Sequence, residues 1–277
     1  MSSTFDAISS LYNYAVACSR IACYMDLGAD GIKEASKLFM QAGWVFEHMR
    51  TLVTGLSPSE VTVDFTAETL GMLSNLMLAQ AQYLFYKKAN EAGMKSAILS
   101  KIAMQVSEYF KKAYELSQTN SGLKSFDQGK FANILMYHTY YFEGMAYLVV
   151  ASEEFKNAGD AGKGMGKAVG YFKATSSVFE KAKSVVTQCP SNYQENFNVK
   201  YQEMIKLRDK AINENKTIYF EKEVPEGGIP KPDLQNFVKL EPVLGDLNEK
   251  LAMEEKFRYI VPPAVRVMNE ELKQALQ

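Results

Sequence analysis

Residues 96–118 read Ser-Ala-Ile-Leu-Ser-Lys-Ile-Ala-Met-Gln-Val-Ser-Glu-Tyr-Phe-Lys-Lys-Ala-Tyr-Glu-Leu-Ser-Gln. Apolar side chains recur here at intervals of three and four residues, at Leu99, Ala103, Val106, Phe110 and Ala113. An α-helix turns once every 3.6 residues, so this spacing places the five side chains on one face. The stretch is predicted to be a helix that packs on a core.

The same periodicity continues along most of the chain, and strand-like alternation is almost absent. The sequence therefore predicts an all-α fold. Thr66 is expected to cap the third helix, and Gly93 to separate it from the fourth. The predicted helices cover 7–26, 31–54, 67–91, 96–118, 129–153, 164–187, 193–215, 245–257 and 263–275.

A weak repeat links the second, fourth and sixth helices. In each, a phenylalanine is followed within three residues by an alanine, and a large apolar residue comes soon after. A small alanine lets a partner helix approach, while the large side chains fill the space between pairs. This pattern favours a tetratricopeptide-like helical solenoid of three antiparallel pairs. The three versions are Phe39, Ala42 and Phe46; Phe110, Ala113 and Leu116; Phe172, Ala174 and Phe179.

Residues 216–244 interrupt the helical pattern, because they hold four of the eight prolines and the pair Gly227-Gly228. Their interleaved apolar side chains favour an extended crossing that lies against the solenoid over a disordered linker. We expect one domain over 1–277, with a solenoid in 1–215, this crossing, and terminal helices in 245–277.

The overall charge does not indicate a strongly anionic partner, so any charged site must come from local clustering. The chain has 31 basic and 32 acidic side chains, so no nucleic acid is expected. Three cysteines without a CxxC pair fit a reducing compartment. No secretory signal, lipidation motif or membrane-spanning run is present, so a cytoplasmic protein is expected.

Residues for catalysis are sparse. His48 and His138 stand far apart, without metal-ligand spacing or a nearby cysteine pair. The glycine-rich run 159–167 superficially resembles a phosphate loop, but Ala161 replaces its first glycine and Ala168 follows Lys167. A loop that opens the sixth helix is the better interpretation. We expect no enzyme, no metal site and no cofactor.

The stretch Leu76-Met77-Leu78-Ala79-Gln80-Ala81-Gln82, with Phe85 after it, resembles the signature helix of the Bro domain in the ALIX family of ESCRT adaptors. Further resemblances follow in the family's order, at 66–73, at Ile218-Tyr219 with Val224-Pro225, and at Val261-Pro262. The resemblance implies a boomerang-shaped domain that lacks roughly the N-terminal third of the family domain.

The resemblance also implies a non-enzymatic adaptor, cytoplasmic and recruited to endosomes. Its concave face would bind the C-terminal amphipathic helix of an ESCRT-III subunit, in endosomal sorting, multivesicular body formation or membrane scission. A peripheral contact with the endosomal membrane and the oligomeric state stay open. The alternative is a helical scaffold that has lost this binding and takes another peptide or protein. The family's binding residues fall on Phe85, Lys88, Ile98, Lys101 and Ile102, with Lys33.

The residues alone leave this site undecided. Ile98 and Ile102 lie about 100° from the core-facing stripe of their helix and would stack as one apolar ridge. Periodicity by itself favours packing against the neighbouring pair, in which case the scaffold alternative gains. If the ridge is exposed, the nearby lysines favour a partner with acidic edges; they are Lys87, Lys88, Lys95, Lys101, Lys111 and Lys112.

Overall fold

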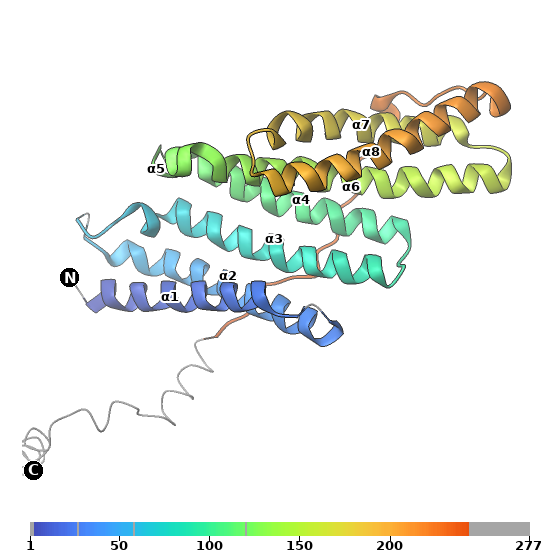
Figure 1. Ribbon diagram of the computed structural model, residues 1–277. Coiled ribbons are helices and arrows are strands. Elements are labelled where there is room, and N and C mark those ends of the chain that lie inside the picture. Colours follow the sequence, from blue (N-terminus) through green and yellow to red (C-terminus); the bar gives the residue numbers. More distant parts are fainter. Residues whose placement is uncertain (1–2, 27, 58, 120, 244–277) are drawn as a thin grey trace, which may run out of the picture. The chain divides into compact units, whose positions relative to one another are not determined.

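The computed structural model describes residues 3–26, 28–57, 59–119 and 121–243, and in these ranges the fold is all-helical (Figure 1). The described helices belong to one compact unit, Met1–Glu241. The predicted helices 245–257 and 263–275 lie outside the described residues. The helices are α1 Ser3–Tyr24, α2 Ala29–Leu52, α3 Ala67–Glu91, α4 Ser96–Thr119, α5 Ser121–Ser125, α6 Lys130–Ala161, α7 Met165–Val186 and α8 Ser191–Glu214.

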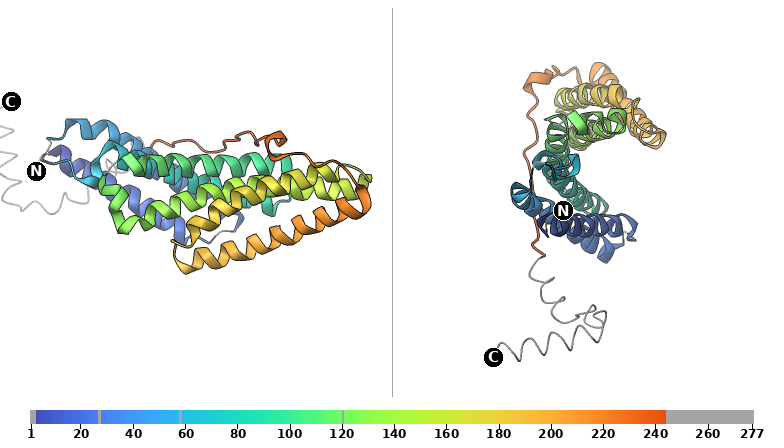
Figure 2. Two further views of the ribbon diagram at one scale, coloured as in Figure 1. Left: turned by 90° about the horizontal axis from the view of Figure 1, so that it is seen from above. Right: turned by 90° about the vertical axis from the view of Figure 1, so that its left-hand side faces the viewer.

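The long helices form three pairs of sequence neighbours, α1 with α2, α3 with α4, and α6 with α7. The pairs are joined because α2 packs on α3 and α4 packs on α6, and α8 then covers α7. Seen nearly end-on, the helices of this unit form an arch (Figure 2). The predicted helical-pair solenoid is confirmed.

Small residues let the helices approach as the repeat predicts. Ala42 and Ala113 are fully buried and Ala174 nearly so. The helices α6 and α7 approach closely at Gly144 of α6, where an added Cβ would clash with the ring of Phe179 in α7. A glycine at this position therefore admits the buried ring.

Helix ends follow local chemistry. Thr66 caps α3 as predicted, because its side chain accepts a hydrogen bond from the backbone N–H of Thr69 at 3.3 Å. The prediction that the fifth helix ends near residue 153 is wrong, since α6 continues to Ala161. Its glycine at 159 is tolerated inside the exposed last turns, and the break comes at Gly162, which has a φ of 69°.

The end of α8 also differs from the prediction. Residues Asn215–Tyr219 add one π-helical turn, and Phe220, with a φ of 54°, ends the helix. Residues 221–241, here called the strap, follow in largely extended conformation.

The strap crosses the helix pairs from the last to the first. Its backbone donates hydrogen bonds from Val224 to the carbonyl of Gly166 (3.1 Å) and from Gln235 to that of Lys101 (3.2 Å). It reaches α2 where the N–H of Glu241 donates to Met40 at 3.3 Å. The strap runs along the outer side of the arch (Figure 2, right). It ties the three pairs together.

The glycine-rich run 159–167 leads into the first turn of α7, and the carboxylate of Glu221 lies at this helix N-terminus. Glu221 accepts hydrogen bonds from the backbone N–H groups of Gly164 (2.7 Å) and Gly166 (2.9 Å). A negative charge at a helix N-terminus is favourable, because unpaired N–H groups and the helix dipole both attract it. This contact fixes the start of the strap.

Candidate partner-binding site on the strap face

The centre of the strap is held by Gln82, a fully buried residue of α3. Its Nε2 donates to the carbonyl of Gln235 (2.8 Å), and its Oε1 accepts from the backbone N–H of Phe237 (3.1 Å). The side-chain amide of Gln82 therefore pairs with two backbone groups of the strap, the carbonyl of Gln235 and the N–H of Phe237.

An aromatic pair forms beside this amide. The ring of Phe237 stacks on that of Phe85, with centroids 6.0 Å apart and planes at 19°. Phe237 keeps 45% of its surface exposed, whereas Val238, which follows it, is 4% exposed. Alternate side chains of an extended segment point to opposite sides, so the strap buries Val238 and presents Phe237.

The polar part of the site comes from α4. Lys101 donates to Asp233 of the strap at 2.8 Å, and this hydrogen bond lowers the pKa of the Asp233 carboxyl. Lys88 is exposed near the end of α3. No carboxylate lies within ion-pair distance of it in the described ranges.

The predicted isoleucine ridge is only half present. Ile98 is half-buried, but Ile102 is 1% exposed, so its prediction as an exposed anchor is wrong. The reason is that α4 packs between α3 and α6 and needs two buried faces. The apolar stripe found in the sequence marks only one of these buried faces, so it could not show that Ile102 belongs to the other.

Lys33 lies on α2, exposed and one turn before Lys37. Lys37 pairs with Glu241 at the end of the strap (3.8 Å). Residues four apart share a helix face, so Lys33 lies on the strap side with Phe85 and Lys101.

The positive charge around the site is smaller than the number of lysines suggests, because most of these lysines are paired with carboxylates. Lys87, Lys111 and Lys112 each have a carboxylate one turn away on the same helix, at 3.9–4.0 Å, and Lys101 pairs with Asp233. Such exposed pairs contribute little stability, but they reduce the local positive potential. Lys88 and Lys95 are the two of the six for which the described structure shows no ion pair.

Of the predicted residues, Phe85 and Lys101 therefore lie on the outer side of the arch, against the expectation of a concave site. Phe85 and Lys101 contact the strap, which runs along that side (Figure 2). Sequence reasoning also missed the contributions of Gln82 and Phe237. The alternation Phe237-Val238-Lys239-Leu240 was the available signal, but it does not say which helix the strand-like segment meets.

The strap face holds no evident metal chemistry. Within the described ranges no cluster of three or more His, Cys, Asp or Glu side chains could hold an ion. No described helix is long and apolar enough to cross a bilayer. The arrangement offers the aromatic pair Phe85 and Phe237. Half-buried Ile98 lies one turn before Lys101 on α4, so the two share a face, and cations lie at the edge. This is the chemistry of a peptide-binding surface.

Comparison with known proteins agrees with this arrangement. Programmed cell death 6-interacting protein of Rattus norvegicus is 38% identical over 117 residues, which are 42% of this chain and only 13% of that protein. A crystal structure of ALIX in complex with the SIVmac239 PYKEVTEDL late domain has a TM-score of 0.76 at 25% identity, covering 98% of this chain and 37% of that one. An ALIX BRO1–CHMP4C complex has a TM-score of 0.72 at 27% identity, covering 87% of this chain and 64% of that one.

A family model described as the BRO1-like domain matches residues 1–274. The strap, residues 221–241, falls within the stretch 216–244 for which the sequence predicted an extended crossing. This chain belongs to the BRO1-like domain family.

Proposed function

We propose that this chain is a non-enzymatic adaptor whose strap face binds the C-terminal amphipathic helix of an ESCRT-III subunit. In this role it would act in the cytoplasm at endosomes, in sorting, multivesicular body formation or membrane scission. The family supports an ESCRT-related adaptor, and one structural relative is an ALIX complex with CHMP4C.

The observation that carries the proposal is the stacking of Phe237 on Phe85 (6.0 Å), because it presents aromatic surface at a place the family resemblance marks. Half-buried Ile98 extends this surface along α4. Exposed Lys88 and Lys33 add positive charge at its edges. A partner helix should therefore be apolar on one face and acidic at the sides.

A titration tests the proposal. Labelled C-terminal helix peptides from the ESCRT-III subunits of the same organism are added to the wild type, to Ile98→Asp and to Ile21→Asp, and anisotropy is recorded. Ile21 is 56% exposed on α1 and provides the matched control. A carboxylate in the apolar contact should weaken binding at least about tenfold, the effect of roughly 1.4 kcal/mol. Ile21→Asp should bind like the wild type.

Equal binding by all three proteins, or by none, would overturn the assignment to this face. The circular dichroism of each variant shows whether its helices remain folded.

The burial of Ile102 favours a second candidate, a scaffold of the same fold that binds a different peptide or protein. Its apolar binding surface would then be smaller than the predicted one, because Ile102 is not available beside Phe85 and Ile98. Failure of every ESCRT-III peptide, with binding of another segment that Ile98→Asp abolishes, would support this candidate.

A further inference from the structure

Helix α6 exposes a second apolar row that the strap does not touch. Phe131, Ile134, His138, Tyr141 and Met145 are spaced three, four, three and four residues apart, and all are partly exposed. This is the a/d spacing of a coiled-coil seam, the pattern that one helix presents when another helix lies along it. Phe131 and Met145 are 14 positions apart (145 − 131), which is about 21 Å along the helix at 1.5 Å per residue.

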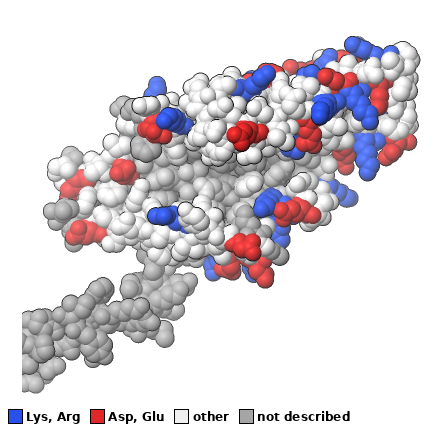
Figure 3. Space-filling view, in the orientation of Figure 1, with Lys and Arg blue, Asp and Glu red and all other residues white. Residues whose placement is uncertain are grey.

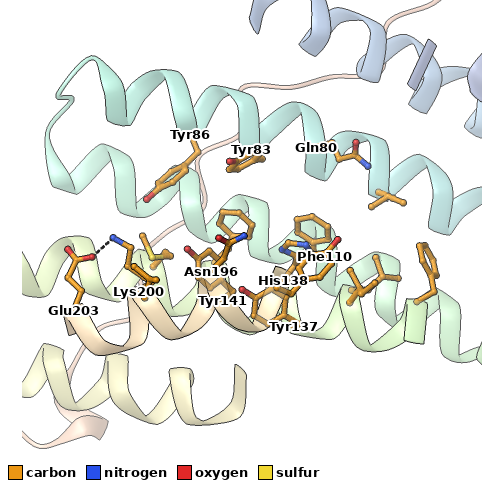
Figure 4. A pocket seen from close by; sticks show the side chains of 18 residues that line it. Gln80, Tyr83, Tyr86, Phe110, Tyr137, His138, Tyr141, Asn196, Lys200 and Glu203 are labelled. Carbon is orange, nitrogen blue, oxygen red and sulfur yellow. Dashed lines mark hydrogen bonds and ion pairs between the residues drawn. The ribbon is translucent and has the colours of Figure 1, made fainter. Parts of the chain in front are cut away.

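Two other helices form walls beside this row. On one side α3 contributes Leu76, Gln80 and Tyr83, and on the other α8 contributes Tyr193, Asn196 and Lys200. Figure 4 shows Gln80 and Tyr83 of the one wall and Asn196 and Lys200 of the other among the side chains that line this space. The open groove between the two walls has a volume of about 940 Å³. Each wall repeats at three- or four-residue spacing, so the groove runs parallel to its helices.

The groove faces away from the strap. Tyr83 lines it and Phe85 contacts the strap, and residues two apart in a helix point about 200° apart. The surface is hollowed here, and its centre is uncharged (Figure 3). Tyr83 and Val199 nevertheless expose 40% and 73% of their surface.

Charge and hydrogen bonding restrict what fits. Lys200 and Glu203 are the charged residues of the lining, and they bind each other at 2.6 Å, so the lining is neutral. In the middle of the row, the Nδ1 of His138 is buried and has no hydrogen-bond partner in the described structure. A polar group at one position of an apolar seam selects a polar group opposite it.

We propose that this groove binds an amphipathic helix of a partner protein, with an apolar, uncharged contact face that carries one uncharged polar residue at the level of His138. It differs from the acidic-edged helix proposed for the strap face. The two surfaces lie on opposite sides of α3, so both helices can bind at once.

The test uses a displayed library of heptad helices with randomised a and d positions, selected on the full chain. Selected peptides are then titrated against the wild type, Asn196→Arg/Val199→Arg and the control Asn198→Arg/Gln202→Arg. All four positions are exposed on α8, but only the first two line the groove. Two arginines in a neutral groove should weaken binding at least about tenfold, and the control should bind like the wild type.

Selected helices should carry one Asn, Gln, Ser or Thr among apolar residues, and Ile98→Asp should leave their affinity unchanged. The proposal is overturned if no selected helix distinguishes the groove variant from its control, or if Ile98→Asp abolishes binding. Because Ile98 belongs to the strap face, failure here leaves the ESCRT-III proposal separately testable.

Discussion

Gln82 is wholly buried in α3, and its Oε1 accepts a hydrogen bond from the backbone N–H of Phe237 at 3.1 Å. Its Nε2 donates to Gln235 on the other side of the same strap residue, Asn236. Replacement by leucine keeps the volume roughly constant but leaves two strap groups without their partner. An unsatisfied group of this kind costs about 1–3 kcal/mol when buried, and less where water reaches it.

We therefore expect Gln82→Leu to free the centre of the strap while the helices stay folded. Hydrogen exchange followed by mass spectrometry should show faster exchange of the amides at 235–238. Gln80→Leu, on the opposite side of α3, is the control and should leave these amides protected. Unchanged exchange in Gln82→Leu would show that the strap does not depend on this amide.

The stacking of Phe85 and Phe237 gives a prediction about coupling. Removing either ring should weaken peptide binding. Because Phe237 stacks on Phe85, part of the contribution of each ring to affinity should depend on the presence of the other. A double-mutant cycle of Phe85→Ala and Phe237→Ala, measured with an ESCRT-III helix peptide, should give a coupling energy of about 0.5–1.5 kcal/mol. Strictly additive losses would mean that the rings contact the peptide independently.

Most of the solenoid could be predicted from the sequence, because a helix that packs on one core shows its period directly. The limits of α3 were predicted to the residue, since Thr66 caps one end and Gly93 follows the other. The long end of α6 could not be predicted, because Gly159 is tolerated in an exposed helical turn.

The site was less accessible to prediction, and Ile102 shows why. Its offset from the main stripe has two explanations, an exposed ridge or a second packed face, and only the position of α4 between α3 and α6 decides for the second. The contribution of Phe237 depends on a contact between residues 152 positions apart (237 − 85). Neither periodicity nor composition contains that contact.

The glycines of α7 explain how the strap approaches. A Cβ at Gly170 would lie 2.7 Å from the carbonyl oxygen of Val224 and 2.9 Å from Cδ1 of Ile229. We expect Gly170→Leu to displace the strap and to lower the free energy of unfolding by about 1–3 kcal/mol, the usual cost of overpacking. Urea denaturation measures this change.

Gly159→Leu provides the matched control, since nothing lies within 4 Å of a Cβ at that exposed helical position. Leucine favours the helix over glycine by somewhat under about 1 kcal/mol, so this variant should be as stable as the wild type or slightly more stable. A Gly170→Leu protein with an unchanged urea midpoint would show that the strap does not need this close approach.

His138 makes the stability of the fold depend on pH. Its ring stacks on Phe110 at 4.6 Å, and burial lowers its pKa from 6.5 to about 4. Well above pH 6.5 the imidazole is neutral in both the folded and the unfolded chain and contributes no pH dependence. As the pH falls from 6.5 toward 4, the unfolded chain takes up a proton that the folded chain refuses, so the free energy of unfolding decreases. Each pKa unit corresponds to about 1.4 kcal/mol, so this loss is at most about 3.5 kcal/mol.

Replacing His138 by phenylalanine keeps an aromatic ring in the stack and removes the titrating group. We expect urea denaturation of His138→Phe between pH 7 and 4 to show a shallower loss of stability than the wild type. His48→Phe is the control and should keep the steeper wild-type dependence, because the ring at 138 still titrates. Carboxylates also titrate in this range in all three proteins, so the difference between the curves isolates the histidine. Parallel curves for the wild type and His138→Phe would contradict the account, because they would mean that folding leaves the protonation of this ring unchanged.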